Sequence, residues 1–236
     1  PFPSQNVAAG LTTDALTTHE LRQLYLDWRD ALIEPCPQQG DARVRYPETN
    51  NDTRSEGIGY GMVIAAYMGD QQTFDGLWGY YQRMSANGLM NWKRNDCAGN
   101  GGGGGNDGSA ADADIDAALA LIVADRQFPG NNYAQDASQI LGAIRAELFN
   151  GGCQGVLMAG SQFGGCDCIN PSYIPPGYYM AYGSVEQQAF WTQARDASYN
   201  YFNAVRNDNT GLVPAWSRVN GDLQIGCNPE VAGGGA

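Results

Sequence analysis

One glutamate stands directly before a run of alternating glycines at the start of a predicted helix. The segment reads Ser-Glu-Gly-Ile-Gly-Tyr-Gly-Met over residues 55–62, and an apolar run continues it to Met68. Each glycine in a helix costs about 1 kcal/mol relative to alanine, so three of them need a reason. One reason is that a ligand or a neighbouring helix approaches the main chain closely. Glu56 at the mouth of such a helix could be a general acid whose pKa is raised by its surroundings.

The same segment also has a purely structural explanation. Ser55 could cap the helix, Glu56 could complement the helix dipole, and the glycines could simply allow tight packing. Taken alone, the local chemistry slightly favours this explanation.

A second cluster of acids lies in the apolar segment 109–128, which predicts a helix with Ser109 as its cap. Helical spacing places Asp112 and Asp116 on one face, while Asp114 points elsewhere. A favourable interaction with the helix dipole explains one carboxylate at a helix entrance, but three repel one another. We therefore expect a site where one of these carboxyl groups is protonated, bound to a metal or bound to a sugar.

Aromatic residues in predicted loops are candidates for stacking against a sugar ring, whose C–H face is apolar. Trp92 follows the polar turn 87–91, and a role in the core is as compatible with its chemistry as a role in stacking. Tyr173 belongs to a tyrosine-rich segment, 170–179, that we expect to form the rim of a site.

The sequence offers little support for a metal or another cofactor, and we expect neither. Cys166 and Cys168 lack the usual spacing of zinc ligands, and the one histidine, His19, falls in the first turn of a predicted helix, where we expect it at the surface. Residues 102–107 match a glycine-rich calcium-binding turn once, but that device works in repeats.

The elements that must position these groups are predicted to be helices joined by loops, without sustained strand alternation, so the expected class is all-α. Two predicted caps are the box Thr17-x-x-Glu20 and the pair Ser184 and Gln187. Helical spacing predicts helices at about 17–32, 57–68, 74–84, 109–128 and 133–149, a short helix after 175–179, and another over 184–205.

Length and charge narrow the class of protein. The 236 residues, of which 43% are hydrophobic, are most simply one domain over 1–236. A net charge of −12 repels phosphate backbones, so nucleic acid is not an expected partner. No apolar run is long enough to span a bilayer, and no membrane partner is expected. The first residues lack the features of a signal peptide, so we expect any such segment to have been removed.

Six cysteines, an even number in loop-like sequence, predict disulfides and therefore a secreted, extracellular or periplasmic protein. Cys153 could pair with Cys166 or with Cys168, and the sequence does not choose between them.

The glutamate segment resembles the acid-bearing motif of glycoside hydrolase family 8, Ser-Glu-Gly-x-Gly-Tyr-Gly-Met, at every fixed position. The resemblance extends over residues 28–216. It includes Ala-x-Asp-Ala-Asp at 110–114 and the landmarks at 170–173 and 211–216. It implies an (α/α)6 barrel whose inner helices deliver carboxylates to an open cleft.

The resemblance also implies roles for individual residues. Glu56 would be the general acid that protonates the leaving glycosidic oxygen, and Asp112 would hold the distorted sugar at the point of cleavage. Trp92 would stack on a neighbouring ring. The remaining residues expected to bind substrate are Tyr60, Asp114 and Tyr173.

The sequence also departs from the family pattern. Ala111 and Ala117 are smaller than the usual residues, which leaves both carboxylates in place. The family inverts configuration, so a second carboxylate must activate water. The Tyr-Asp-Ala-type segment that usually carries this base does not occur, and by the order of landmarks it is expected just after residue 236. Glu230 lies close to the expected place of this base in the sequence and is the less favoured candidate to replace it. The chain predicts about seven helices against the twelve of a full barrel, so the expected barrel is incomplete.

Two classes of function follow from these observations. The first is a secreted, inverting endo-β-1,4-glycanase acting on cellulose or a related β-glucan, with xylan and chitosan as further substrates. The second is a non-catalytic relative, a carbohydrate-binding or self-assembling structural protein that lacks the base. The missing base segment favours the second class, whereas an acid set among glycines favours the first. The oligomeric state is not predicted.

Overall fold

Helices dominate the structure, as the sequence predicted. The computed structural model describes residues 17–101, 107–149, 152–223 and 227. Within this part the α-helices are α1 (Thr18–Leu32), α2 (Ser55–Met68), α3 (Gln71–Arg83), α4 (Ala111–Gln127), α5 (Tyr133–Leu148), α6 (Pro176–Gly183) and α7 (Gln188–Val205). Their number matches the seven predicted helices, and none of the described helices is both long and apolar enough to cross a membrane.

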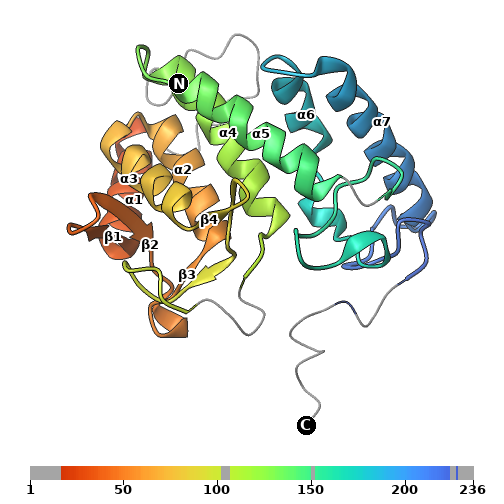
Figure 1. Cartoon of the computed structure of the whole chain (residues 1–236), viewed down its shortest axis with the longest axis horizontal. Helices are drawn as coiled ribbons and strands as arrows, with labels where there is room; N and C mark the ends of the chain where they lie inside the picture. The colour runs from red at the N-terminus through yellow and green to blue at the C-terminus, as the bar shows by residue number, and fades with distance from the viewer. Residues whose placement is uncertain (1–16, 102–106, 150–151, 224–226, 228–236) are drawn as a thin grey trace.

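Three helix hairpins make up most of the molecule: α2 packs on α3, α4 on α5, and α6 on α7. The first helices of the hairpins also contact one another in order, α2 with α4 and α4 with α6. Figure 1 shows α4 and α5 in the middle, with α1–α3 on one side and α6 and α7 on the other. The first helices therefore form one layer, and their partners cover it.

Glycine at position 59 allows α2 and α4 to touch along their backbones. A Cβ at Gly59 would lie 2.8 Å from the carbonyl oxygen of Ala113 and 3.2 Å from the Cβ of Asp116. The other two glycines of the motif serve other neighbours. A Cβ at Gly57 would lie 2.9 Å from the Tyr46 ring, and one at Gly61 would lie 2.8 Å from Leu77. The glycines thus allow close packing on three sides of α2.

Alanines on α4 complete this close packing. Helix α4 packs against α2, α5 and α6, and six of its alanines have no exposed surface: Ala111, Ala113, Ala117, Ala118, Ala120 and Ala124. A second part of the core is aromatic. Trp191 of α7 packs against Tyr179 and Tyr182 of α6, with ring centroids 5.5 and 5.0 Å away.

The described residues also form six short strands, which the sequence did not predict and which pair in three antiparallel ladders. They are β1 (Ile33–Cys36) with β2 (Asp41–Val44), β3 (Thr53–Arg54) with β6 (Lys93–Arg94), and β4 (Ser85–Ala86) with β5 (Leu89–Met90). Strands of two to four residues are too short to show an alternating pattern. The β3–β6 ladder matters most, because it joins the residues before α2 to those after Trp92.

The helix caps test several predictions. Thr17 and Glu20 form the predicted capping box, and His19 is exposed in the first turn of α1. Three other predicted caps are wrong, because α2, α4 and α7 begin after Arg54, Ala110 and Gln187, none of which makes a side-chain cap. Ser55 is itself the first residue of α2, Ser109 precedes the cap of α4, and Ser184 ends α6, where its hydroxyl donates to the carbonyl of Ala181.

All six cysteines form disulfides, as predicted: Cys36–Cys97, Cys153–Cys166 and Cys168–Cys227. The structure therefore chooses Cys166, not Cys168, as the partner of Cys153. The first and third bridges join positions 61 and 59 residues apart, and so they hold distant loops together.

Candidate active site

Glu56 occupies the first turn of α2, where the chain has just left the β3–β6 ladder. The amide of Ser55 donates a 2.9 Å hydrogen bond to the carbonyl of Trp92, which ties the start of α2 to the loop that carries the tryptophan. The Glu56 carboxyl is half-buried, and burial raises its pKa above the ordinary value of 4.5. The charge of Arg54 and the Ser55 hydroxyl act in the opposite direction. Glu56 therefore holds a proton more readily than an exposed glutamate, as a general acid must.

Asp112 lies at the corresponding place on α4, in the first turn. Burial raises its pKa to about 8, and the neighbouring charge of Glu56 is the next contribution. The amide of Ala113 donates to its Oδ1 at 3.0 Å and opposes the shift. Since Gly59 lies against Ala113, the two helices meet close to both carboxyl groups.

Glu56 and Asp112 thus form one electrostatic unit at the starts of two packed helices. Two carboxyl groups that share a poorly solvated site do not both ionise readily, so the pair holds a proton to higher pH than either group would alone. The raised pKa of Asp112 is consistent with the expectation that one acid of the cluster is protonated. The protonated form is also the state that a proton donor to a glycosidic oxygen requires.

Three tyrosines surround this pair. The pKa values of Tyr46, Tyr60 and Tyr173 are all raised, first by burial and then by the charges of Glu56 and Asp112. Tyr60 has 52% of its surface exposed, whereas Tyr46 and Tyr173 are half-buried. The structure therefore brings two of the predicted tyrosines to the site and adds Tyr46. The sequence signal for Tyr46 is indirect: it packs on Gly57, a motif glycine.

Trp92 is half-buried, so it is not a core tryptophan. The guanidinium carbon of Arg54 lies 5.3 Å from its ring centroid, and the Lys93 ammonium lies 6.0 Å away. The Lys93 ammonium in turn forms an ion pair with the Asp52 carboxylate at 3.0 Å. Trp92 is thereby held next to the start of α2 by one backbone hydrogen bond and two cations.

Asp114 is in a different environment from the one predicted. Its side chain has no exposed surface, and one of its oxygens accepts a hydrogen bond from the Tyr81 hydroxyl. Burial raises its pKa to about 7, although Tyr81 and Ser109 lower it. A carboxyl group sealed behind α4 does not suit direct contact with a substrate. We therefore do not include Asp114 among the substrate-binding residues proposed below.

Asp116 shares a face of α4 with Asp112, as the helical spacing predicted. Its pKa is raised by burial to about 6, and its charge contributes to the raised pKa of both Asp112 and Tyr60. The Tyr178 hydroxyl of α6 bonds to it and lowers its pKa. The sequence identified Asp116 as a neighbour of Asp112 but did not assign it to the site.

The described residues contain no group of three or more potential metal ligands among His, Cys, Asp and Glu. The glycine-rich turn at 102–107 and Glu230 lie outside the described residues, apart from Asp107 itself. The groups that influence Glu56 and Asp112 in the described part are carboxyl and phenol groups together with the guanidinium of Arg54.

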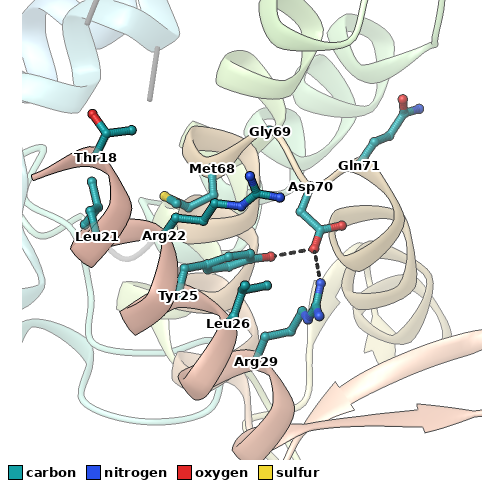
Figure 2. A pocket seen from close by; sticks show the side chains of 10 residues that line it. All are labelled: Thr18, Leu21, Arg22, Tyr25, Leu26, Arg29, Met68, Gly69, Asp70 and Gln71. Atoms are coloured by element: carbon teal, nitrogen blue, oxygen red, sulfur yellow. Dashed lines mark hydrogen bonds and ion pairs between the residues drawn. The ribbon is translucent and has the colours of Figure 1, made fainter. Parts of the chain in front are cut away.

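A cavity of about 360 Å³ lies elsewhere, between α1 and the turn from α2 to α3 (Figure 2). Tyr25 and Arg29 of α1 both bond to Asp70 there, at 2.8 and 3.2 Å. Asp70 also caps α3 through the amide of Thr73. These contacts hold α1 against the α2–α3 hairpin, so we interpret this cavity as a gap between packed helices and not as the catalytic site.

Solved structures identify the class of fold. The chain is similar to the apo structure of a β-1,3-1,4-glucanase from Paenibacillus sp. X4, with a TM-score of 0.78 and 28% identity, over 89% of this chain and 60% of that one. A reducing-end-xylose-releasing exo-oligoxylanase shares the fold at a TM-score of 0.72 and 20% identity. Both are (α/α)6 barrels, so the helix hairpins of this chain belong to that class of fold, as predicted.

Sequence comparison identifies the family. The model of glycosyl hydrolases family 8 matches residues 28–232, and the chain belongs to this family. It is 38% identical to Endoglucanase 2 of Ruminiclostridium josui, over 85% of this chain and 44% of the relative. It is 34% identical to Endoglucanase C of Ruminiclostridium cellulolyticum, over 93% of this chain and 48% of the relative. The chain thus spans less than half the length of these curated relatives.

Proposed function

We propose that this chain carries the catalytic acid of a secreted, inverting endo-β-1,4-glycanase that hydrolyses a β-linked glucan. The observation that carries the proposal is the pair Glu56 and Asp112 at the starts of two helices that meet at Gly59. Burial raises the pKa of both carboxyl groups, and the charge of Glu56 raises that of Asp112 further. Membership of glycosyl hydrolases family 8 and the names of the endoglucanase relatives support this choice. Cellulose or a related β-glucan is the first substrate, before xylan and chitosan.

Glu56 is assigned as the general acid. It protonates the glycosidic oxygen as the bond to the anomeric carbon breaks, and the leaving sugar departs with the new hydroxyl group. Burial keeps its proton in place until the substrate arrives. Arg54 limits this shift, since its positive charge stabilises the carboxylate that remains after proton transfer.

Asp112 is assigned to the sugar ring at the point of cleavage. With a pKa of about 8, Asp112 is mostly protonated near neutral pH, so it is a poor base for water. A hydrogen bond to a sugar hydroxyl suits it better. Trp92, Tyr60 and Tyr173, which lie close to the pair, are assigned to substrate binding.

Inversion also needs a base on the opposite face of the sugar, about 6.5–9.5 Å from the acid. We assign this base to residues outside the described part of the protein. The three disulfides support the proposal of an extracellular or periplasmic location. A neutral glucan is also compatible with a net charge of −12.

The test is the Glu56→Gln variant, assayed by reducing-sugar release from carboxymethylcellulose, mixed-linkage β-glucan, xylan and chitosan. Glutamine keeps the shape of the side chain, but its amide is not acidic enough to protonate the leaving oxygen. We therefore expect hydrolysis to fall at least 100-fold, with oligosaccharide binding retained. Equal turnover in the variant would remove Glu56 from the role of acid. If the unmodified protein binds these polymers but cleaves none of them, the non-catalytic, carbohydrate-binding alternative is correct.

A further inference from the structure

A second cavity, of about 180 Å³, lies between α3 and α5 beside the β4–β5 hairpin. None of the residues assigned above to catalysis or substrate binding lines it. A cavity needs roughly 10–15 Å³ of this kind of volume to hold one water molecule, so this one has room for a ligand of the size of a single sugar ring. The lining combines two aromatic rings with polar side chains: Trp78, Tyr81, Gln82, Ser85, Gly88, Asp136, Gln139 and Ile140.

The aromatic part of the cavity is held rigid. Trp78 is half-buried and stacks on Tyr81, with ring centroids 5.2 Å apart and planes 25° from parallel. Its indole nitrogen donates a 3.0 Å hydrogen bond to Asp136 of the facing helix α5. Tyr81 is fixed at its far end by the hydrogen bond to Asp114. Tyr81 has no exposed surface, so the ring that a ligand can meet is Trp78, with Tyr81 behind it. A ring with so little freedom to move loses little entropy when a ligand stacks on it.

The polar part of the cavity has hydrogen-bonding capacity to spare. Gln82 and Gln139 are exposed, and neither amide has a hydrogen-bond partner among the described residues. Asp136 bonds Trp78 through one carboxylate oxygen, and no bond within the described part occupies the other. Amides donate and accept, and a carboxylate accepts, so this rim matches a ligand rich in hydroxyl groups.

The charges on the lining exclude an anionic ligand. No lysine or arginine lines the cavity, and Asp136 gives it a negative charge. A phosphate or carboxylate would be repelled there. A neutral ring with an apolar face and hydroxyl groups at its edge satisfies both halves of the lining.

We propose that the Trp78 cavity binds one glycosyl unit of a neutral polysaccharide, at a place separate from Glu56. The class of ligand follows from the lining itself; that it is the polymer cleaved at Glu56 rests on the proposed function. Because α3 and α5 lie on the outside of the layer formed by α2, α4 and α6, such a site would hold a chain on the outer surface of the protein.

The test uses cellotetraose and xylotetraose as probes, with the Glu56→Gln variant as the background to prevent hydrolysis. Isothermal titration measures the affinity and stoichiometry of these probes for the Glu56→Gln protein. The same measurement is made on that protein with Gln82→Ala and Gln139→Ala added. Both glutamines are exposed, so the fold is retained. The matched control is Gln72→Ala/Gln135→Ala, which changes exposed glutamines on the same two helices away from the cavity.

We expect the Gln82/Gln139 variant to lose at least fivefold in affinity for the outer site while the control binds as before. Trp78→Phe, which keeps a ring but loses the bond to Asp136, should weaken binding of the same site. Equal binding by all variants, or a single site abolished by Trp92→Ala, would overturn the proposal. Hydrolysis is measured separately from binding at the outer site. Failure of the role proposed for Glu56 and failure of the site proposed at the Trp78 cavity are therefore distinguishable.

Discussion

Gly59 of α2 lies so close to Ala113 of α4 that a Cβ at position 59 would sit 2.8 Å from the Ala113 carbonyl oxygen. Backbone atoms of a buried helix cannot move aside as the end of a flexible side chain can. This contact therefore sets the distance between the helix starts that carry Glu56 and Asp112, and it makes the glycine motif a device for positioning two acids.

The first prediction concerns Gly59→Ala. The added methyl group has to push α2 away from α4, so we expect a loss of about 1–3 kcal/mol of unfolding free energy, the usual cost of overpacking a core. The displaced acids should also lower activity on β-glucan more than the loss of folded protein explains. Denaturant unfolding and initial rates at matched folded concentration check both effects.

The control for this variant is Gly142→Ala in α5. A Cβ there would meet only the end of the Arg145 side chain, at 4.0 Å. Alanine is the better helix former, so this variant should gain about 0.5–1 kcal/mol and keep its activity. If Gly59→Ala were as stable and as active as Gly142→Ala, the close contact would not matter.

The second prediction concerns the disulfides. A bridge that closes a longer loop removes more entropy from the unfolded chain, about 3 kcal/mol for 15 residues and about 4.7 for 100. Cys36 and Cys97 are separated by 61 residues, and Cys153 and Cys166 by 13. Cys36→Ala/Cys97→Ala should therefore lower the melting temperature more than Cys153→Ala/Cys166→Ala, as calorimetry would show. The opposite order would mean that the short bridge supports native contacts in the loop of residues 152–168.

The sequence predicted the seven helices and the acid-bearing positions because each depends on a local pattern. Helical spacing and the motif around Glu56 are both readable within about twenty residues. Spacing also predicted that Asp112 and Asp116 share a face and that Asp114 does not. The direction in which Asp114 points was predictable, but its burial against Tyr81 was not.

What the sequence did not show depends on contacts between distant segments. Tyr46 reaches the site because it packs on Gly57, and Tyr81 reaches Asp114 across 33 positions. The three ladders are too short to show a period. The predicted serine caps were wrong because contacts elsewhere help to set where a helix begins, as the bond from the Ser55 amide to Trp92 does for α2. The pairing of Cys153 was open for the same reason.

The third prediction concerns pH. Asp112, Asp114 and Asp116 have pKa values of about 8, 7 and 6 in the folded protein, above the ordinary 3.8. Between pH 4 and pH 8 the folded state thus binds more protons than the unfolded state, and the free energy of unfolding falls as pH rises. We expect a loss of more than about 1 kcal/mol, the value of one pKa unit, measured by urea unfolding across this range.

Asp112→Asn is the matching variant. Its side chain cannot ionise, so the part of the slope that comes from Asp112 should disappear, and at pH 8 the variant should be more stable than the unmodified protein. Activity should fall at the same time, since the proposed contact with the sugar is altered. A stability that rises between pH 5 and pH 8 in the unmodified protein would contradict the raised pKa values.

The fourth prediction concerns the hydrogen bond from Tyr81 to Asp114. Both side chains are fully buried, so Tyr81→Phe leaves a carboxyl group without its donor and should cost about 1–3 kcal/mol of unfolding free energy. The matched control is Tyr179→Phe, because the buried Tyr179 hydroxyl makes no hydrogen bond of normal geometry in the described part of the chain, although Ser198 lies near it. Removing this hydroxyl should be neutral or slightly stabilising.

A double-mutant cycle with Asp114→Asn separates the pair from the two residues taken singly. If the hydrogen bond fixes the start of α4, the double variant should be more stable than the sum of the single losses predicts. The pH–activity profile of Tyr81→Phe should also shift, since a less well held Asp114 changes the charge that Asp112 experiences. Additive losses together with an unshifted profile would show that Tyr81 only fills space behind α4.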